Sequence, residues 1–310
     1  MPNQINWNKI GVYILLTFGI SWTIAGIMWL LGISLGSTTS VILIAGLYMP
    51  GPALATFVLQ KYVYKEGFQQ YGWRFDKKAW KWLVATPLLF VALILLTFAI
   101  IGILGNLHIV EQFGQLDFSQ EGFDRQLSAL LDEKVDMDNI NLPSLPPKIM
   151  FLAFIAQGII AGSTVNLPFM FGEEFGWRGL LLRETQALGF VKSSLFIGIV
   201  WGLWHLPIVL MGHNYPSNPY WGVLMMCLFT TALCPLFAYV RLKTKSILGA
   251  CMLHGMINAT GALFVLYVAN GNEFFSSIAG WAGVLAGLII ACSIYLLDKN
   301  FIRDFSSTNA

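Results

Sequence analysis

Long apolar runs separated by short polar stretches dominate the pattern of the chain. A transmembrane helix needs ~20 consecutive, mostly apolar residues, and a window of that length finds roughly eight such runs. They begin near residues 10, 41, 83, 149, 192, 220, 246 and 276. The pattern predicts an all-α, polytopic membrane protein of about eight transmembrane helices, with residues 1–310 forming a single membrane domain.

The composition agrees with this prediction. Of 310 residues, 56% are hydrophobic and 11% are charged, and the mean hydropathy of +0.68 is high; soluble globular proteins carry about 25% charged residues. The formal net charge is only +2, which gives no reason to expect a nucleic-acid partner. We therefore expect the lipid bilayer to surround the chain, as in a multi-pass integral protein, and the compact sequence favours a bacterial cell membrane.

Charged residues between the apolar runs predict the orientation of the chain. Basic residues gather between runs two and three, between runs six and seven, and after run eight: Lys61, Lys65, Arg74, Lys77, Lys78, Lys81, Arg241, Lys243, Lys245, Lys299 and Arg303. The segment 108–147 is acidic instead, with Glu111, Asp117, Glu121, Asp124, Asp132, Glu133, Asp136 and Asp138. Cytoplasmic loops carry an excess of Lys and Arg. The charges therefore predict that both termini are cytoplasmic and that residues 108–147 form an extracytoplasmic loop.

Two adjacent glutamates interrupt the fourth apolar run, in the stretch FGEEFGWRG. An ionisable side chain in hydrocarbon costs ~2.5–3.5 kcal/mol unless it is paired or lines a wet cavity. Glu174 and Arg178 are four residues apart and can pair on one helix face. Glu173 points about 100° away from that face and lacks this partner. Either Glu173 is a functional group, or both glutamates only mark the end of the run.

Two of the four histidines lie within apolar runs. His205 lies in run five, shortly before Pro207, and His254 in run seven. His254 and Asn258 are one helical turn apart, so their side chains project from the same face. A lone histidine in such a run usually packs helices together, but two of them with an asparagine and a free glutamate fit that role less well. We expect these groups in the cytoplasmic half of the membrane, and we expect His213 and Asn214 in an outer loop.

A buried set of one carboxylate, two imidazoles and one amide is suited to hydrolysis. A carboxylate can take a proton from water that a histidine orients, and a second histidine with an amide can stabilise an oxyanion. The same side chains could instead bind a divalent metal such as zinc through Glu173, His205 and His254. The sequence has no HExxH motif, no GxSxG motif and no aspartate within the apolar runs, which argues against zincin, serine and aspartyl protease chemistry.

The three motifs resemble those of the CPBP (CAAX protease and bacteriocin-processing, or Abi) intramembrane proteases, which include the Rce1-type CAAX prenyl endopeptidases. The family pattern is EExxxR, then FxxxH, then HxxxN. Its positions are occupied by Glu173, Glu174 and Arg178, by Trp201 and His205, and by His254 and Asn258. Trp201 stands where phenylalanine is usual. The resemblance covers about residues 150–265, which we expect to form the catalytic core.

The resemblance implies a role for each motif residue. Glu173 and His205 would activate the water, and His254 and Asn258 would form the oxyanion hole. Three further residues would orient or support them, namely Glu174, Arg178 and Trp201. The family is described both as metalloproteases and as enzymes with a metal-free glutamate mechanism, so bound zinc and no metal remain alternatives.

We therefore predict an intramembrane endopeptidase that hydrolyses a peptide bond of a membrane-anchored or lipidated substrate near the cytoplasmic face. A non-catalytic membrane scaffold or bacteriocin-immunity factor is one alternative. A proton-coupled transporter is another, since it would also bury Glu and His in a helix bundle. The chain shows no two-fold hydropathy repeat, which disfavours a transporter.

Overall fold

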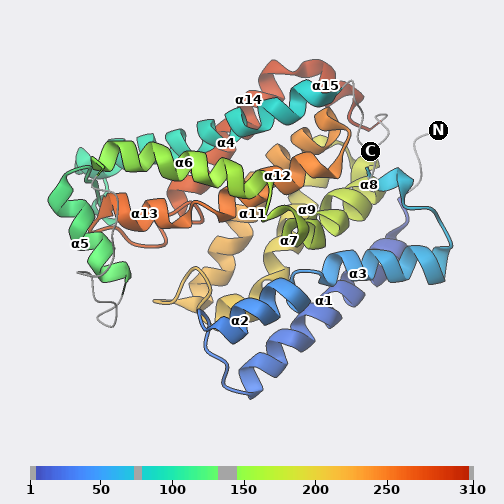
Figure 1. Ribbon diagram of the computed structural model, residues 1–310. Coiled ribbons are helices and arrows are strands. Elements are labelled where there is room, and N and C mark those ends of the chain that lie inside the picture. The colour runs from blue at the N-terminus through green and yellow to red at the C-terminus, as the bar shows by residue number, and fades with distance from the viewer. Residues whose placement is uncertain (1–4, 73–78, 132–144, 307–310) are drawn as a thin grey trace.

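The computed structural model describes residues 5–72, 79–131 and 145–306, and in these ranges it is almost entirely helical (Figure 1). Several predicted basic and acidic positions lie outside the described residues: Arg74, Lys77, Lys78, Asp132, Glu133, Asp136 and Asp138. All residues of the three motifs are described. The prediction of an all-α, polytopic membrane protein is confirmed.

Five helical segments of the described chain are long and apolar enough to cross a membrane. They are α1 (Trp7–Leu30), α2 to η2 (Thr38–Tyr64), α4 with η5 (Trp80–Asn106), α11 (Pro219–Thr244) and α12 with α13 (Ile247–Tyr267). The pair formed by α6 (Pro147–Ser163) and the segment from α7 to η9 (Leu167–Leu188) would be a sixth, bent by 63°. Two shorter apolar helices are α9 (Phe190–Trp204) and α14 (Trp281–Leu297). Each predicted run thus contains helix, while the number of eight spans and the cytoplasmic termini stay predictions.

Several of these segments are broken at identifiable residues. The segment from α2 (Thr38–Leu43) changes to the π-helix η1 (Ile44–Tyr48), and α3 (Gly51–Val58) then begins with Pro52 in its first turn. In the bent pair of α6 and α7, Thr164 leaves helical geometry, and Pro168 lies in the first turn of α7 (Leu167–Glu174). Proline lacks the N–H that would continue the previous turn. Local chain chemistry therefore sets the breaks that the hydropathy pattern alone does not show.

The long helix α11 lies at the centre of the fold and packs against α9, α12 and α14. Its contact with α9 is close because of two glycines. A Cβ atom at Gly198 would lie 2.4 Å from Thr231 Cα, and one at Gly202 would lie 2.5 Å from Cys227 Cα. Small residues permit such close packing of membrane helices. The close approach holds the end of α9, with His205, against the centre of the molecule.

A two-stranded pairing joins distant parts of the chain at one end of the molecule. Strand β1 (Gln115–Leu116) pairs antiparallel with β2 (Val268–Ala269). The helix α5 (Gln120–Leu130) follows β1 and begins at Ser119, whose side chain accepts a hydrogen bond from the Gly122 N–H. Figure 1 shows α5 and α13 (Gly261–Tyr267) at this end, and α8 (Leu182–Thr185) with α15 (Lys299–Asp304) at the opposite end. The described part of the acidic segment is therefore an ordered cap on one end of the bundle.

Candidate active site

The pairing predicted within the glutamate motif is present and buried. Arg178 lies in the π-helix η8 (Phe175–Leu181), directly after α7, and its Nη1 is 3.0 Å from Glu174 Oε1. The same carboxylate oxygen lies 2.8 Å from His254 Nδ1 on α12 (Ile247–Asn258). Glu174 and Arg178 are almost completely buried. Glu174 thus links an arginine of its own helix to a histidine 80 residues away, a contact that the sequence pattern did not predict.

The Arg178 guanidinium is stacked between two aromatic rings. Its central carbon is 4.3 Å from the centre of the Trp201 ring and 4.2 Å from that of Phe237. A cation over an aromatic face is attracted by the ring quadrupole, most strongly where water is excluded. The rings and Glu174 together allow a full positive charge to stay inside the helix bundle.

Glu173 points away from this ion pair, as predicted, and has a different partner. Its side chain is only 3% exposed, and its Oε2 accepts a hydrogen bond of 2.9 Å from the Trp201 indole nitrogen. In the described residues, Glu173 forms no ion pair. The tryptophan at the position where phenylalanine is usual therefore provides a hydrogen-bond donor that a phenylalanine lacks.

His205 stands at the end of α9, where the helix geometry changes. Its backbone N–H donates to the Gly202 carbonyl, which leaves the Trp201 carbonyl available to the imidazole. His205 Nδ1 lies 2.8 Å from the Trp201 carbonyl oxygen. A carbonyl only accepts, so Nδ1 carries the proton and Nε2 has the free lone pair. Trp201 therefore contacts both candidate water-activating groups, Glu173 through its side chain and His205 through its backbone.

His254 and Asn258 project from the last turns of α12. The His254 ring packs edge-on against Trp201 at 5.4 Å and Phe237 at 5.7 Å. Asn258 is exposed, and its Nδ2 lies 3.5 Å from the Met170 sulfur. A thioether is a weak acceptor. The Asn258 amide therefore keeps its donor capacity for another group.

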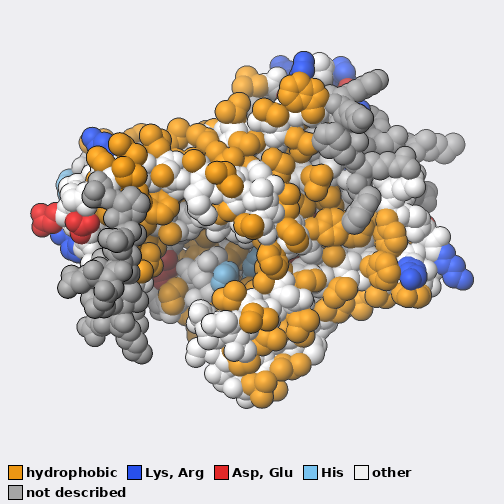
Figure 2. Space-filling view, viewed as in Figure 1, with side chains coloured by type: hydrophobic (Ala, Val, Ile, Leu, Met, Phe, Trp, Pro, Cys, Tyr) orange, Lys and Arg blue, Asp and Glu red, His pale blue; other side chains and the backbone are white. Residues whose placement is uncertain are grey.

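One cavity of about 130 Å³ joins the four candidate catalytic residues, Glu173, His205, His254 and Asn258. A water molecule in a cavity needs at least about 10–15 Å³ by this kind of measure, so several waters fit. Figure 2 shows a hollow on the viewed face in which histidine side chains are visible. Trp201 also lines the cavity, whereas Glu174 and Arg178 lie behind its wall.

The cavity contains two residues that the sequence pattern left out of the site. His213 and Asn214 lie in the loop after α10 (Leu206–Leu210) and line the same cavity as Glu173. Burial lowers the pKa of His213 to about 4, so this imidazole is neutral at pH 7. His213 and Asn214 lie in a loop, as predicted. The sequence did not predict that this loop folds back over the cavity. The one available signal was that both residues follow His205 closely in the chain. His108 lies elsewhere, beside Gln115.

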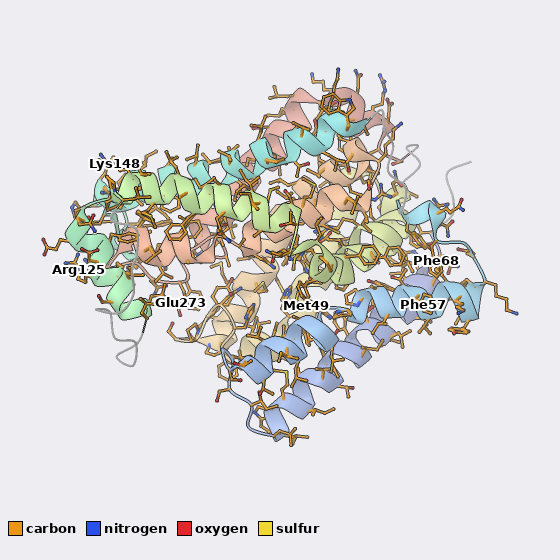
Figure 3. All side chains as sticks on the ribbon, viewed as in Figure 1. Met49, Phe57, Phe68, Arg125, Lys148 and Glu273 are labelled. Atoms are coloured by element: carbon orange, nitrogen blue, oxygen red, sulfur yellow. The ribbon has the colours of Figure 1, made fainter. Side chains whose placement is uncertain are left out.

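Residues before the motifs complete the cavity wall. Ile44, Tyr48 and Met49 line it from η1 and the turn after it. The Tyr48 hydroxyl donates to the Trp204 carbonyl at 2.5 Å, and the Trp22 indole nitrogen donates to the same oxygen at 3.0 Å. Figure 3 shows Met49 where the layer of α1, α2 and α3 meets the rest of the bundle. The N-terminal helices are therefore part of the site.

The described side chains do not fit a metal site. Among them, no three His, Cys, Asp or Glu side chains are grouped so that they could hold an ion. In particular, Glu173 is hydrogen-bonded to Trp201, and His254 presents Nδ1 to Glu174. The chemistry below is therefore derived from the side chains alone.

Comparison with protein families agrees with this geometry. Residues 145–260 match the family of Rce1-like type II CAAX prenyl endopeptidases. These matched residues are called the Rce1-like segment. The four candidate catalytic residues all lie within it.

The chain is also similar to a named protein. The chain is 29% identical over 133 residues to CAAX prenyl protease 2 of Methanococcus maripaludis. The aligned part is 41% of this chain and 46% of that protein, so the chain spans about half the length of its relative. The Rce1-like segment ends before α13, and the cavity residues Ile44, Tyr48 and Met49 precede it in the chain.

Proposed function

We propose that this chain is an intramembrane endopeptidase that cleaves a membrane-anchored or lipidated peptide with water activated by Glu173 and His205. The observation that carries the proposal is the single cavity that collects Glu173, His205, His254 and Asn258 from three separate helical segments. The similarity to Rce1-like endopeptidases supports the same reaction class.

In the first step, a water molecule lies between Glu173 and His205. The Glu173 carboxylate accepts one proton of the water, and the free Nε2 of His205 accepts a hydrogen bond from the other. The water oxygen forms a bond to the carbon of the scissile carbonyl, whose oxygen becomes an oxyanion. Trp201 holds the Glu173 carboxylate through the indole hydrogen bond of 2.9 Å, so the base is positioned before substrate binds.

In the second step, the oxyanion is stabilised and the peptide bond breaks. The Asn258 amide donates to the oxyanion, and His254 donates from Nε2 when its ring carries both protons. Glu174 lies 2.8 Å from His254 Nδ1 and so fixes the orientation of the ring. The tetrahedral intermediate then collapses, the carbon–nitrogen bond breaks, and the proton on Glu173 moves to the leaving amine. An oxyanion donor of this kind is worth about 2.7–4 kcal/mol in soluble proteases.

The substrate is proposed to be anchored in the membrane. The catalytic groups lie inside a bundle with many apolar side chains on its surface, which suits a substrate that reaches the bundle through lipid. In a bacterial cell membrane, a peptide with a transmembrane anchor is a better candidate than a prenylated protein. The relative's name refers to CAAX prenyl substrates, and lipidated peptides therefore belong in the test.

A non-catalytic scaffold is the second candidate, because the buried contacts of Glu174, Arg178 and His254 would also hold helices together. One experiment distinguishes a peptidase from a non-catalytic scaffold. The protein in nanodiscs is incubated with a library of transmembrane and lipid-anchored peptides, and products are identified by mass spectrometry. We expect cleavage by wild type and none by His205→Ala, at equal membrane abundance and melting temperature. Cleavage by neither protein, or equal cleavage by both, contradicts the proposal.

The metal-free mechanism has its own test. Cleavage by the wild-type protein is measured after treatment with a strong chelator and again after zinc is added back. We expect the rate to stay unchanged in both conditions. A loss of activity that zinc restores would show that a metal takes part.

A further inference from the structure

Two side chains from outside the motifs meet at the carbonyl group directly before His205. The Tyr48 hydroxyl of η1 donates to the Trp204 carbonyl oxygen at 2.5 Å, and the Trp22 indole nitrogen of α1 donates to it at 3.0 Å. A carbonyl oxygen has two lone pairs, so it can accept both bonds. Tyr48 and Trp204 are almost fully buried, and their rings lie 4.5 Å apart. The N-terminal helices therefore hold this carbonyl group inside the bundle.

These bonds fix the peptide unit from which the His205 side chain projects. The N–H of this unit donates to the Gly202 carbonyl. Its C=O, which belongs to Trp204, accepts from Tyr48 and Trp22. The ring nitrogen Nδ1 is bound to a carbonyl of the same helix, α9. Since both polar groups of the peptide unit are bound, the direction of the free Nε2 depends on the N-terminal helices as well as on α9.

The turn that follows η1 packs against the helix that carries Glu173. A Cβ atom at Gly172 would lie 3.0 Å from the Met49 carbonyl oxygen and 3.0 Å from Pro50 Cα. Gly172 directly precedes Glu173 in α7, and a small residue permits this close approach. Residues 48–50, which we call the η1–α3 junction, thus contact the chain next to each of the two groups proposed to activate water.

Helix α1 holds the η1–α3 junction in place. The Ser21 hydroxyl donates to the Tyr48 carbonyl at 2.9 Å in a buried position. A Cβ atom at Gly51, the first residue of α3, would lie 2.1 Å from Ser21 Oγ, so α1 and α3 are in close contact there. The next residue of α1, Trp22, is the one that donates to the Trp204 carbonyl. The junction therefore cannot shift without breaking its contacts with α1.

We propose that the η1–α3 junction sets the spacing between Glu173 and His205. Tyr48 and Trp22 are then positioning residues for His205. The two water-activating groups come from different helices, and one water molecule contacts both only if their separation is correct. The junction precedes the Rce1-like segment, so the matched residues contain the reacting groups but not the part that spaces them. The effect on catalysis rests on the proposed peptidase function, whereas the position of the His205 ring does not.

The position of the His205 ring is measured without any substrate. The chain has four histidines, so NMR spectra of ¹⁵N-histidine-labelled protein in detergent micelles contain few ring signals, and each is assigned by single substitution. Tyr48→Phe removes one hydroxyl and keeps the aromatic ring. We expect the His205 ring signals to shift or broaden in this variant, while those of His108, which lies beside Gln115, stay unchanged.

Tyr215→Phe is the matched control for this measurement. It also removes a buried hydroxyl that donates to a carbonyl, that of Ala279 at 2.6 Å, but Tyr215 does not line the cavity. The His205 signals of this variant should match those of wild type. Unchanged His205 signals in folded Tyr48→Phe overturn the proposal. If Tyr48→Phe does not accumulate, Trp22→Phe, which removes the second donor, takes its place with the same expected result.

The spacing is tested with two glycine substitutions. In Gly172→Ala, the new Cβ atom would lie 3.0 Å from the Met49 carbonyl oxygen, so the junction and α7 must move apart. Gly46→Ala is the control, because Gly46 lies in η1 and a Cβ atom there meets nothing within 4 Å. A misplacement of about 1 Å can cost about 100-fold. For the smaller shift here we expect kcat to fall by about 10-fold in Gly172→Ala and in Tyr48→Phe, with KM little changed, and to stay at the wild-type value in Gly46→Ala and Tyr215→Phe.

The outcomes distinguish this proposal from the peptidase function. Wild-type kcat in both Gly172→Ala and Tyr48→Phe overturns the spacing role and leaves the peptidase function intact. If wild type cleaves no peptide, the peptidase function is contradicted, and the NMR signals of His205 still decide whether Tyr48 positions its ring.

Discussion

Replacement of Arg178 by methionine tests whether the buried charges behind the cavity stabilise the fold as a pair. In wild type, the side chains of Arg178 and Glu174 are 1% and 0% exposed and their atoms are 3.0 Å apart. Arg178→Met leaves the Glu174 carboxylate buried with His254 as its remaining partner. Removal of one partner of a buried ion pair costs about 3–5 kcal/mol, and we expect the lower end because His254 remains.

The second variant separates the charge from the packing. Glu174→Gln combined with Arg178→Met removes both charges and keeps a side chain of similar size at each position. Because replacement of a whole buried pair is often close to neutral, we expect the double variant to recover at least about 1.5 kcal/mol relative to Arg178→Met. The free energy of unfolding is measured by titration with denaturing detergent in mixed micelles.

Arg125→Met is the matched control. Arg125 is 59% exposed and lies 3.4 Å from Asp117, and an exposed pair contributes about 0–1 kcal/mol. The control should therefore change the stability by less than about 1 kcal/mol. If the double variant is no more stable than Arg178→Met, the loss comes from the ring contacts with Trp201 and Phe237, and the pairing argument is wrong.

Three further outcomes are expected. Asn258→Ala should lower kcat by about 100-fold or more, the usual cost of an oxyanion donor, with KM little changed; an unchanged kcat would remove Asn258 from the oxyanion hole. Trp201→Phe removes the donor to Glu173 but keeps an aromatic ring below Arg178, so we expect kcat to fall by up to about 10-fold (1.4 kcal/mol) at unchanged stability. Trp177→Phe is its control, because the Trp177 indole nitrogen has no hydrogen-bond partner among the described residues, and equal kcat values for the two variants would refute the positioning role. The hydrogen bond from Lys9 at 2.8 Å holds the pKa of Glu66 below its ordinary value of 4.5, so its stabilisation is present above that value and lost as the pH falls through the lower folded pKa. Melting temperatures in acid should therefore fall less for Glu66→Gln than for wild type, and parallel pH curves would contradict this assignment.

Much of the fold follows from the sequence because hydropathy acts on each segment by itself. Each predicted apolar run contains a helix, since a long apolar stretch in lipid must satisfy its backbone hydrogen bonds internally. The Glu174–Arg178 pair was also predictable, because residues four apart on a helix face each other. Hydropathy averaged over a long window does not show the breaks at Thr164 and Pro168 or the short length of α9. These features depend on local backbone geometry and packing.

The grouping of the motif residues in one place was predictable, while most of their contacts were not. The motifs named Glu173, His205, His254 and Asn258, and the fold brings them to one cavity. The hydrogen bond from Trp201 to Glu173 spans 28 positions, and the contact of His254 with Glu174 spans 80. Such pairs are decided by how helices pack against each other. Position alone placed His213 in a loop, and only the folded chain shows that this loop lines the cavity.

The role of Glu173 as the base is the central claim, and Glu173→Gln tests it most directly. The glutamine has nearly the same size and its amide oxygen can still accept from Trp201, so the fold should be kept, whereas the amide cannot take a proton from water. Cleavage of an identified substrate is followed by mass spectrometry, with Glu121→Gln, a change at a 90% exposed side chain, as control. General-base catalysis contributes about 10²–10⁴-fold, so we expect Glu173→Gln to lose at least about 100-fold in kcat while the control keeps wild-type activity. Full activity of folded Glu173→Gln would contradict the account.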